Sequence, residues 1–457
     1  MTDVRAAVRD AGGPELLERL ESLERVKQRR TRTIAAPDRH ARPDLDVVVA
    51  GGGLWSIVAP LLARRGLRVA VVERGTAGLA HREWNASWPE LDALVRVGLV
   101  TRTELEALVI ARYRTGTCRF HGGGTYPVRG VLDCAVDAGG LLAHARRAGE
   151  AAGVTYLDRH EIVAEASGET AIAIDAGTVL TAKVLVDARG AASPYASADL
   201  VCPTVGGVLA GLDFDPEVGE ILATVDPVSA GRQHVWEGFP GLPGETTVYL
   251  FYYARADEPA SLIDLYARFF ETLPRYKTGA SRLVRPTFGF IPGWSRLVPA
   301  PAAPPGRIVL VGDAAARQSP LTYCGFGATL RSLQGAVDRI GDACDRPGPV
   351  PAHVMQDAPI HALTGALAHM LASRRFHGDE LNELLDASFH SLHAMGEDAY
   401  AALLRDELPP VALIGFLRRT AQRHPAVWGQ VTRGLGFGRL GRWGVEALRA
   451  LTTRPAA

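Results

Sequence analysis

A glycine-rich turn between two short apolar runs constrains the fold of this chain more than any other feature. Residues 44–50 read DLDVVVA, a β-branched run typical of a buried parallel strand, and three glycines starting at Gly51 follow directly. Residues 54–65 have a helical pattern that Gly66 ends, and residues 67–73 read LRVAVVE, a second apolar run. We therefore predict one β–α–β unit of about 30 residues.

The spacing of small and acidic residues in this unit is typical of a dinucleotide-binding turn. Gly51 permits the tight turn from strand to helix, and Gly53 lets the backbone approach a pyrophosphate at the start of the helix. Ser56 takes the third small position, where Gly or Ala is usual. Glu73 follows Gly53 by 20 residues, at the strand end where an acid accepts a hydrogen bond from a ribose hydroxyl. Arg74, next to it, is a further candidate contact for the dinucleotide.

Two later segments favour FAD over NAD as that dinucleotide. Residues 306–315 read GRIVLVGDAA, and the pair Gly312 and Asp313 resembles the Gly-Asp motif of hydroxylase-type flavoproteins, whose Asp binds the ribityl chain of FAD. Residues 182–190 read AKVLVDARG, and this strand end with Gly190 resembles a third motif of the same flavoproteins. FAD is therefore the cofactor that we predict.

A loop that leads into a helix follows the Gly-Asp motif. Residues 319–333 read SPLTYCGFGATLRSL, which places Pro320, Gly325 and Gly327 on the loop and the first helical turn. Small residues there would let the backbone approach the flavin ring, and the helix N-terminus could stabilise negative charge on a reduced flavin. We predict these three residues as cofactor contacts.

The rest of the chain divides by pattern. The apolar runs near residues 182–190 and 306–315 fit further strands of the first sheet, and alternating runs such as TTVYLFYYAR suggest an antiparallel layer. We predict an α/β protein: a Rossmann-like FAD-binding domain of the glutathione-reductase/hydroxylase type, with an inserted antiparallel β substrate domain and a helical C-terminal region. The expected units are an N-terminal helix and linker (1–43), the first part of the FAD domain (44–199), the substrate domain (200–300), the last part of the FAD domain (301–345) and the C-terminal helices (346–457).

The amino-acid composition limits the kinds of partner that this chain is expected to bind. The chain has 50 basic and 50 acidic residues, so no single-sign field draws it to nucleic acid. Its five cysteines are scattered without metal-ligand spacing, which suits a reducing cytoplasm and predicts no metal site. No signal peptide or spanning run is evident. A basic stretch at residues 25–32 and the arginine-rich C-terminal helices leave peripheral membrane contact as an alternative, and the oligomeric state is open.

Several segments together resemble one narrower family. Residues 82–91 (REWNASWPEL), 235–240 (VWEGFP) and 273–277 (LPRYK), with the SPLTYCGFG loop, are similar to the cyanobacterial and chlorobial type of lycopene cyclase and its plant plastid paralogue. The similarity extends from about residue 44 to residue 343. The resemblance implies a flavoenzyme that closes a ring on the ψ-end of a linear carotenoid, with NAD(P)H as reductant of the flavin. Protonation of the terminal alkene starts the reaction, and no net electrons move.

Such a reaction needs an acid that stays protonated at neutral pH. Many lycopene cyclases have a Phe-Leu-Glu-Glu stretch for this purpose, whereas this chain reads YLFYYARADE and has Tyr252 at that place. The catalytic candidates are therefore Glu83, Glu237 and Tyr252, with Asp213 behind them. Several aromatic side chains are expected either to line a polyene tunnel or to pack in the core: Trp84, Trp88, Trp236, Phe239, Phe251, Tyr252 and Tyr253.

Two other classes of function stay open. The first is an FAD-dependent oxidoreductase of secondary metabolism, either a monooxygenase or a prenyl reductase. The second is a paralogue that binds flavin or carotenoid without turnover. The absence of the Phe-Leu-Glu-Glu stretch supports this alternative. A halogenase is less favoured, because the chain has no WxWxIP-like segment.

Overall fold

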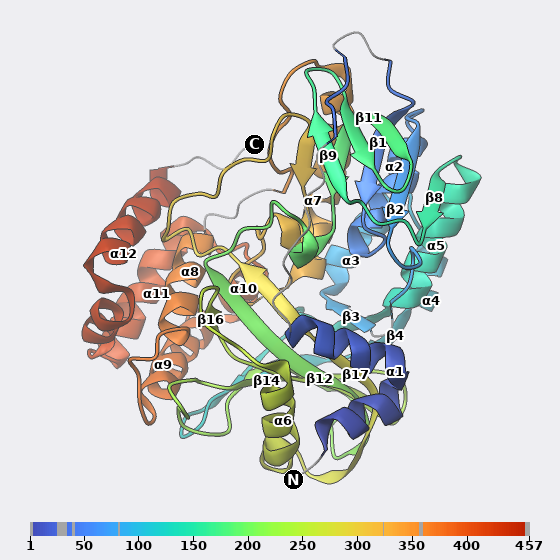
Figure 1. Cartoon of the computed structure of the whole chain (residues 1–457). Helices are drawn as coiled ribbons and strands as arrows, with labels where there is room; N and C mark the ends of the chain where they lie inside the picture. The colour runs from blue at the N-terminus through green and yellow to red at the C-terminus, as the bar shows by residue number, and fades with distance from the viewer. Residues whose placement is uncertain are drawn as a thin grey trace.

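The predicted β–α–β unit lies at the centre of a seven-stranded sheet in the upper part of Figure 1. The structure is a computed structural model, and it describes residues 3–24, 34–38, 42–80, 83–322, 324–355 and 360–452. The sheet order is β8-β2-β1-β11-β10-β9, with β18 beside β11. Its strands are β1 (Leu45–Ala50), β2 (Val69–Glu73), β8 (Thr155–Asp158), β9 (Ala164–Ser167), β10 (Ile172–Asp175), β11 (Val179–Asp187) and β18 (Ile308–Leu310).

Strand β1 is buried on both faces because helices and strands cover both sides of this sheet. Val47 and Val49 pack with α2 (Val58–Ala63), α5 (Ala138–Ala151) and α7 (Gly325–Asp345), and Val48 packs on the opposite face against β10 and β18. The four apolar runs that the sequence assigned to this sheet pair as predicted, since β1 is parallel to β2 and β11, and β11 is parallel to β18.

The second sheet is antiparallel for the most part and has eight strands in the order β16-β12-β15-β14-β13-β5-β6, with β17 beside β12. Most of it comes from residues 200–293, as the sequence indicated. Two strands come from residues 115–128, upstream of the segment assigned to this layer. The strands are β5 (Thr115–Arg119), β6 (Thr125–Val128), β12 (Leu200–Leu212), β13 (Val218–Ala223), β14 (Val235–Pro240), β15 (Glu245–Phe251), β16 (Ala254–Arg255) and β17 (Gly279–Gly293).

Helices cover one face of this second sheet. α6 (Leu262–Tyr276) and the N-terminal helix α1 (Val4–Glu24), which is kinked at Gly13, pack there with Leu20 fully buried. A small third sheet lies beside the seven-stranded sheet. It consists of β3 (Glu83–Ala86), β7 (Cys134–Asp137) and β4 (Val109–Arg112), with helices α3 (Trp88–Arg96) and α4 (Arg102–Leu108). The basic stretch at residues 25–32 is outside the described residues.

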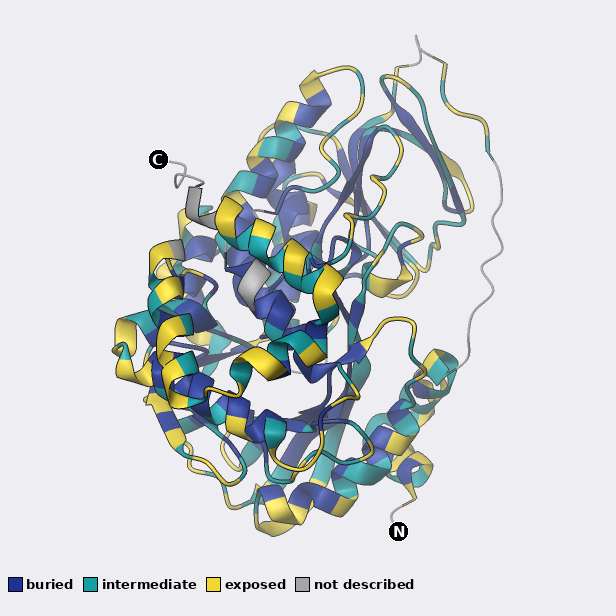
Figure 2. Cartoon of the chain, turned by 90° about the vertical axis from the view of Figure 1, so that its left-hand side faces the viewer, coloured by how far each residue is buried: buried dark blue, intermediate teal, exposed yellow. Residues whose placement is uncertain are grey.

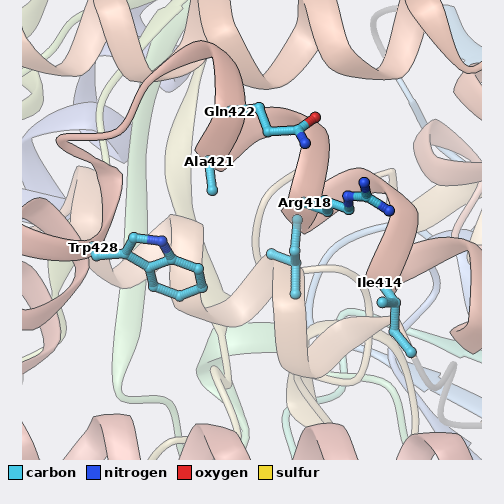
Figure 3. Close-up of a pocket in the computed structure, with 6 residues that line it drawn as sticks. Ile414, Arg418, Ala421, Gln422 and Trp428 are labelled. Atoms are coloured by element: carbon cyan, nitrogen blue, oxygen red, sulfur yellow. The ribbon is translucent and has the colours of Figure 1, made fainter.

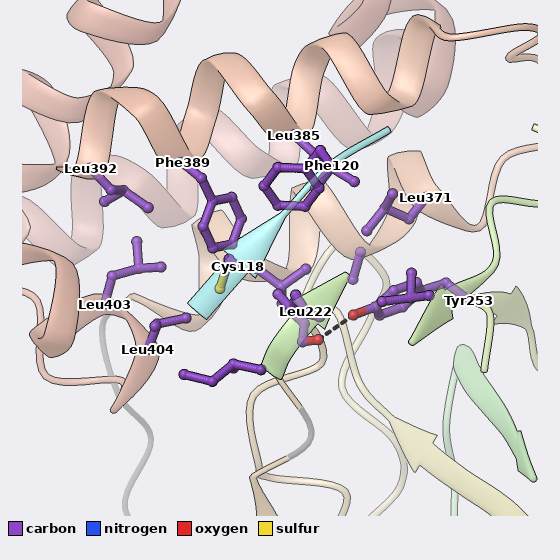
Figure 4. Close-up of a cluster of buried hydrophobic side chains, with 14 of the residues drawn as sticks. Cys118, Phe120, Leu222, Tyr253, Leu371, Leu385, Phe389, Leu392, Leu403 and Leu404 are labelled. Carbon is purple, nitrogen blue, oxygen red and sulfur yellow. Dashed lines mark hydrogen bonds between the residues drawn. The ribbon is translucent and has the colours of Figure 1, made fainter. Parts of the chain in front are cut away.

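The predicted helical C-terminal region consists of five helices that lie on the left in Figure 1. They are α8 (His361–Leu371), α9 (Glu380–Ala394), α10 (Glu397–Leu404), α11 (Pro410–Arg423) and α12 (Val427–Thr452). Their apolar sides form one core with the other face of the antiparallel sheet, which Figure 4 shows around Phe120 and Phe389. Figure 2 shows that their outer surfaces are largely exposed. Within the described ranges, no helix is both long and apolar enough to cross a membrane.

An ion-pair cluster joins the starts of β1 and β2 to the middle of β11. Asp46, 6% exposed, accepts hydrogen bonds from Arg68 at 2.9 and 3.1 Å and pairs with the Lys183 ammonium at 2.8 Å. Burial would raise the pKa of the Asp46 carboxyl, but the hydrogen bonds and charges of Arg68 and Lys183 lower it to about 2. The Asp46 carboxyl therefore binds a proton less tightly in the folded state than in the unfolded state.

We expect Asp46→Asn to lower the free energy of unfolding by about 2 kcal/mol at pH 7, because each unit of pKa shift corresponds to about 1.4 kcal/mol. The stabilisation by Asp46 is complete above the ordinary pKa near 3.8 and is lost as the pH falls toward 2. Urea unfolding from pH 7 down to pH 3 should show the gap between wild type and variant narrowing. The exposed neighbour Asp44→Asn should change stability by less than about 0.5 kcal/mol.

Candidate functional site

The glycine turn after β1 has closed positions at Gly51 and Gly52 and an open position at Gly53. Gly51 adopts φ +115°, and a Cβ there would lie 2.6 Å from the carbonyl oxygen of Ala188, so only glycine fits. A Cβ on Gly53 would meet no atom within 4 Å. Ser56 is buried in the 3₁₀ turn η1 (Leu54–Ile57) that leads into α2. The turn therefore leaves space at Gly53, where the sequence analysis placed the approach of a pyrophosphate.

Glu73 holds the open turn in place from the end of β2. Its carboxylate accepts hydrogen bonds from the backbone N–H of Gly52 and of Gly75, each at 2.8 Å. A carboxylate has four lone-pair positions, so these two bonds leave capacity to accept from a ribose hydroxyl. Arg74 is exposed beside it.

The two later glycine motifs lie next to each other in space, although more than a hundred residues separate them in sequence. Gly190 in η2 (Gly190–Ala192) is 3.7 Å, measured from an added Cβ, from the Cβ of Asp313 in η3 (Gly312–Ala314). Asp187, fully buried at the end of β11, accepts from the Ser193 hydroxyl at 2.6 Å and pairs with Arg189. The sequence predicted both motifs, and the structure brings them to the carboxyl ends of parallel strands.

The Arg189 guanidinium is held by two carboxylates. It pairs with Asp187 at 2.8 Å and with Glu165 at 2.9 Å. Burial would lower the pKa of Arg189, but these hydrogen bonds raise it well above its ordinary value. Asp313 accepts a hydrogen bond from the Gln318 amide at 3.0 Å, and the same amide donates to the carbonyl of Pro292 in β17. Gln318 thus ties the Gly-Asp motif to the antiparallel sheet.

Trp55 was not anticipated from the sequence and lies between the glycine turn and the Gly-Asp motif. Gly312 adopts φ +56°, and a Cβ on it would lie 2.9 Å from Trp55 Nε1, so the indole fits only against glycine. Trp55 is 4% exposed, and its Nε1 has no hydrogen-bond partner among the described residues. A buried N–H donor between two cofactor motifs, with open space at Gly53, fits the phosphate or ribityl oxygens of FAD.

The loop before α7 connects the cofactor motifs to the rest of the molecule. Pro320 is buried, and a Cβ on Gly325 would meet nothing within 4 Å, so the first turn of α7 is open on that side. A Cβ on Gly327 would instead lie 2.6 Å from Glu90 Oε1. Trp84 of β3 packs on Phe326 with ring centroids 5.2 Å apart. The segment of residues 83–91 therefore contacts the start of α7.

A buried charged network beside this helix was missed by the sequence analysis. Arg331 of α7 pairs with Glu90 and with Asp406, the latter at 3.3 Å, and the side chain of Asp406 is 2% exposed. His361 Nε2 lies 3.6 Å from the same Asp406 carboxylate. The network links α3, α7 and the C-terminal helices, and its members are at least 30 residues apart in sequence, so no local pattern could reveal it.

Two of the predicted acids lie in or near the interior. Glu83 is 5% exposed on β3, and its Oε1 is 3.7 Å from an added Cβ on Gly241, just beyond β14. Tyr113, 5% exposed, accepts a hydrogen bond from the Asn85 amide. Burial and then the charge of Glu83 raise the pKa of Tyr113 well above its ordinary value. Like Trp55, Tyr113 is a residue of the candidate site that the sequence did not predict.

Glu237 lies on the face of β14 that packs toward the C-terminal helices. Strand alternation puts Glu237 on the same face as Val235 and Phe239, which belong to that core, and it pairs in register with Tyr249. Burial and then the charge of Glu237 raise the pKa of Cys324, which lies on the loop before α7. The carboxylate is therefore within electrostatic range of that loop.

Tyr252 lies on the opposite face of the sheet. It packs under the Arg232 guanidinium at 5.0 Å and against His234, with the α1 and α6 core behind it. Tyr253 points the other way, and its hydroxyl donates to the carbonyl of Leu321 in the loop before α7, the dashed line in Figure 4. Asp213 is exposed and accepts from the Thr278 hydroxyl at 2.9 Å. Of the predicted acids, Glu237 lies on the sheet face that packs toward the loop, and Glu83 lies on β3 near Gly241 and Tyr113.

The aromatic candidates divide in the same way. Phe239 stacks on Tyr113 at 6.2 Å and Phe251 packs on Tyr253, so both belong to the face of Glu237. Trp236 stacks on Tyr276 of α6 at 4.6 Å, on the other face. Trp88 is covered by the Arg112 guanidinium at 4.0 Å.

Solved structures share this architecture. The chain matches a geranylgeranyl bacteriochlorophyll reductase-like protein from Thermoplasma acidophilum at TM-score 0.55 and 15% identity, over 85% of this chain and 98% of that one. It matches halogenase PltM in complex with phloroglucinol and FAD at 0.57 and 12%, over 89% and 91%. It also matches a flavoprotein/dehydrogenase from Cytophaga hutchinsonii at 0.53 and 13%, over 88% and 100%.

The sequence comparisons identify no narrower family for this chain. No family model matches the chain, and no curated protein matches it significantly in sequence. The resemblance to lycopene cyclases therefore stays a hypothesis. The structural matches at 12–15% identity nevertheless confirm the predicted architecture. The chain has the Rossmann-type α/β fold of these proteins, with an antiparallel sheet layer and a helical C-terminal region.

Proposed function

We propose that this chain binds FAD and acts on a hydrophobic isoprenoid or polyene, with proton-initiated ring closure of a carotenoid end group as the reaction. The observation that carries the proposal is the bond between the Tyr253 hydroxyl and Leu321, which joins the loop before α7 to the sheet face of Glu237. A substrate between this loop and that face would lie between the cofactor site and a carboxyl group.

The residues divide into those that hold the cofactor and those that handle the proton. Gly53, Glu73, Asp313 and Trp55 would hold the dinucleotide, and Gly325 would admit the ring at the start of α7. When bound and reduced, the flavin supplies negative charge that stabilises a cation in a dry pocket. The NAD(P)H that the family resemblance implies would serve as its reductant.

Glu237 is the proposed proton donor, and Glu83 is the second candidate. Apolar surroundings favour the protonated form of a carboxyl group, which is the form an acid catalyst needs. Phe239 and Phe251 on the same face are buried and would pack against the substrate. Tyr113 stays protonated because of its burial, so it would present a neutral hydroxyl beside Glu83.

Expression in a bacterium that accumulates lycopene tests the proposal. Appearance of γ- or β-carotene by chromatography supports ring closure, and unchanged lycopene beside a flavin-loaded protein contradicts it for that substrate. The NADPH consumed per product separates isomerisation from redox chemistry. One NADPH for each product would favour a prenyl reductase or a monooxygenase instead. A flavin-loaded protein that binds polyene without any product would favour the non-catalytic alternative.

Trp55→Phe tests the cofactor site directly. The variant keeps an aromatic ring but removes the unpartnered N–H, so we expect FAD affinity to fall about 10- to 100-fold, the value of one hydrogen bond to a charged group. The cofactor-free protein should change little in stability, because the loss of a buried donor without a partner offsets the packing that the smaller ring gives up. Flavin fluorescence titration and thermal unfolding measure the two quantities. Equal FAD affinity in both proteins would place the cofactor away from the indole.

A further inference from the structure

An apolar cavity lies inside the C-terminal helical bundle, apart from the glycine motifs. Its own volume is about 70 Å³ between α8, α9, α11 and α12, and the surface groove beside Trp428 adds about 450 Å³. None of the residues that line it carries a charge. Met370, Phe389 and Phe416 are among its walls and are at most 6% exposed. The cavity therefore suits a neutral and mainly hydrocarbon ligand.

One wall of the cavity belongs to the proposed active site. Leu321, in the loop before α7, lines the cavity and accepts the hydrogen bond of Tyr253. The same apolar core continues from this loop to the sheet face of Glu237. A chain that fills the cavity therefore has one end beside the loop that leads to the cofactor site.

Two polar groups that line the cavity have no hydrogen-bond partner among the described residues. Thr420 of α11 is 4% exposed, and its hydroxyl makes no hydrogen bond to any described residue. Trp443 Nε1 of α12 is buried and equally without a partner in the described part of the chain. Both groups line the cavity and both can donate a hydrogen bond. A ligand oxygen would satisfy them, because an unpaired buried donor is unfavourable.

The cavity adjoins an open groove on the protein surface. Figure 3 shows this groove between α11 and the start of α12, where Ile414, Arg418 and Trp428 surround it. Leu417 and Trp428 line both the groove and the cavity. Trp428 is 52% exposed, so the groove gives a ligand an apolar entrance.

We infer that this cavity binds an isoprenoid chain that carries an oxygen at one end. The oxygen accepts from Thr420 and Trp443, and the hydrocarbon extends past Phe389 toward Leu321, where the reacting end lies. The isoprenoid class rests on the proposed function, whereas the neutral, oxygen-bearing chain rests on the cavity. The inference narrows the substrate from a plain hydrocarbon to a linear carotenoid or prenyl compound with a hydroxyl or keto group.

Equilibrium dialysis of the purified full-length protein with radiolabelled geranylgeraniol, a C20 isoprenoid alcohol, tests the site. Ser388→Phe fills the cavity from α9 and should weaken binding at least tenfold. Glu383→Phe is the matched control, because residue 383 is exposed on the same helix. Near-ultraviolet circular dichroism shows whether each variant is folded. Binding by folded Ser388→Phe at wild-type strength would overturn the site.

Thr420→Val keeps the shape of the side chain and tests the oxygen contact without filling space. We expect about fivefold weaker binding of geranylgeraniol, the value of one neutral hydrogen bond. Binding of squalene, an isoprenoid without oxygen, should not weaken. Trp443→Phe should behave in the same way. Equal effects on both ligands, or none on either, would overturn the oxygen contact.

These measurements do not depend on turnover. Failure of the cyclase proposal would appear as absence of ring closure in a protein that binds geranylgeraniol and flavin. Failure of the cavity proposal would appear as ligand binding that neither Ser388→Phe nor Thr420→Val changes.

Discussion

Replacing Glu237 with Gln should lower the rate of ring closure about 10²- to 10⁴-fold, the usual contribution of a general acid. The amide has nearly the same shape but cannot donate an acidic proton to an alkene. The residue lies on the inner face of β14, with Phe239 beside it and Tyr249 opposite. Flavin content and substrate binding should stay near wild type. Carotenoid products per bound flavin, measured in the purified protein, give the rate.

Two variants show whether the effect belongs to Glu237. Tyr252→Phe is the matched control from the neighbouring strand end, because its ring lies on the other face of the sheet. It should leave the rate within about twofold. Glu83→Gln separates the two acids, since Glu83 is 5% exposed beside Tyr113. If Glu83→Gln abolishes ring closure while Glu237→Gln leaves it unchanged, Glu83 is the donor and our assignment is wrong.

The parts of the fold that could be predicted from sequence are those with local signals. The β–α–β unit and the strand ends at Asp187 and Gly312 each follow from a run of apolar residues and a glycine close to its end, and the C-terminal helices follow from the helical spacing of their apolar residues. Gly51 and Gly53 were both named as turn residues. The structure adds that they differ, since only the side-chain position of Gly53 is open.

The parts that could not be predicted depend on contacts between distant segments. Alternation along YLFYYAR shows that Tyr252 and Tyr253 face opposite ways, but not which face meets the loop before α7. The position of Tyr113 beside Glu83 depends on a pairing across the small sheet and the start of the antiparallel sheet. Trp55 looks like an ordinary core residue until Gly312 is placed against it.

The strongest test of the cofactor site is Gly53→Val. Gly53 has a negative φ, with φ −83° and ψ −150° at the edge of the extended region, and nothing lies within 4 Å of an added Cβ, so a side chain there meets no clash. The cofactor-free protein should therefore keep its melting temperature. A valine side chain would nevertheless occupy the space through which a pyrophosphate reaches the turn. We expect FAD affinity to fall at least 100-fold, because contacts to a charged group contribute about 1.5–3 kcal/mol each.

Gly51→Ala is the matched comparison for this prediction, because it lies two residues away in the same turn. Its Cβ would meet the carbonyl of Ala188 at 2.6 Å, and its φ of +115° disfavours any side chain, so this variant should lose stability itself. Flavin fluorescence titration with thermal unfolding therefore separates two effects: Gly53→Val removes binding from a stable protein, and Gly51→Ala weakens the fold. Normal FAD binding by Gly53→Val would mean that the pyrophosphate does not pass this turn, and the cofactor assignment of Glu73 and Trp55 would fall with it.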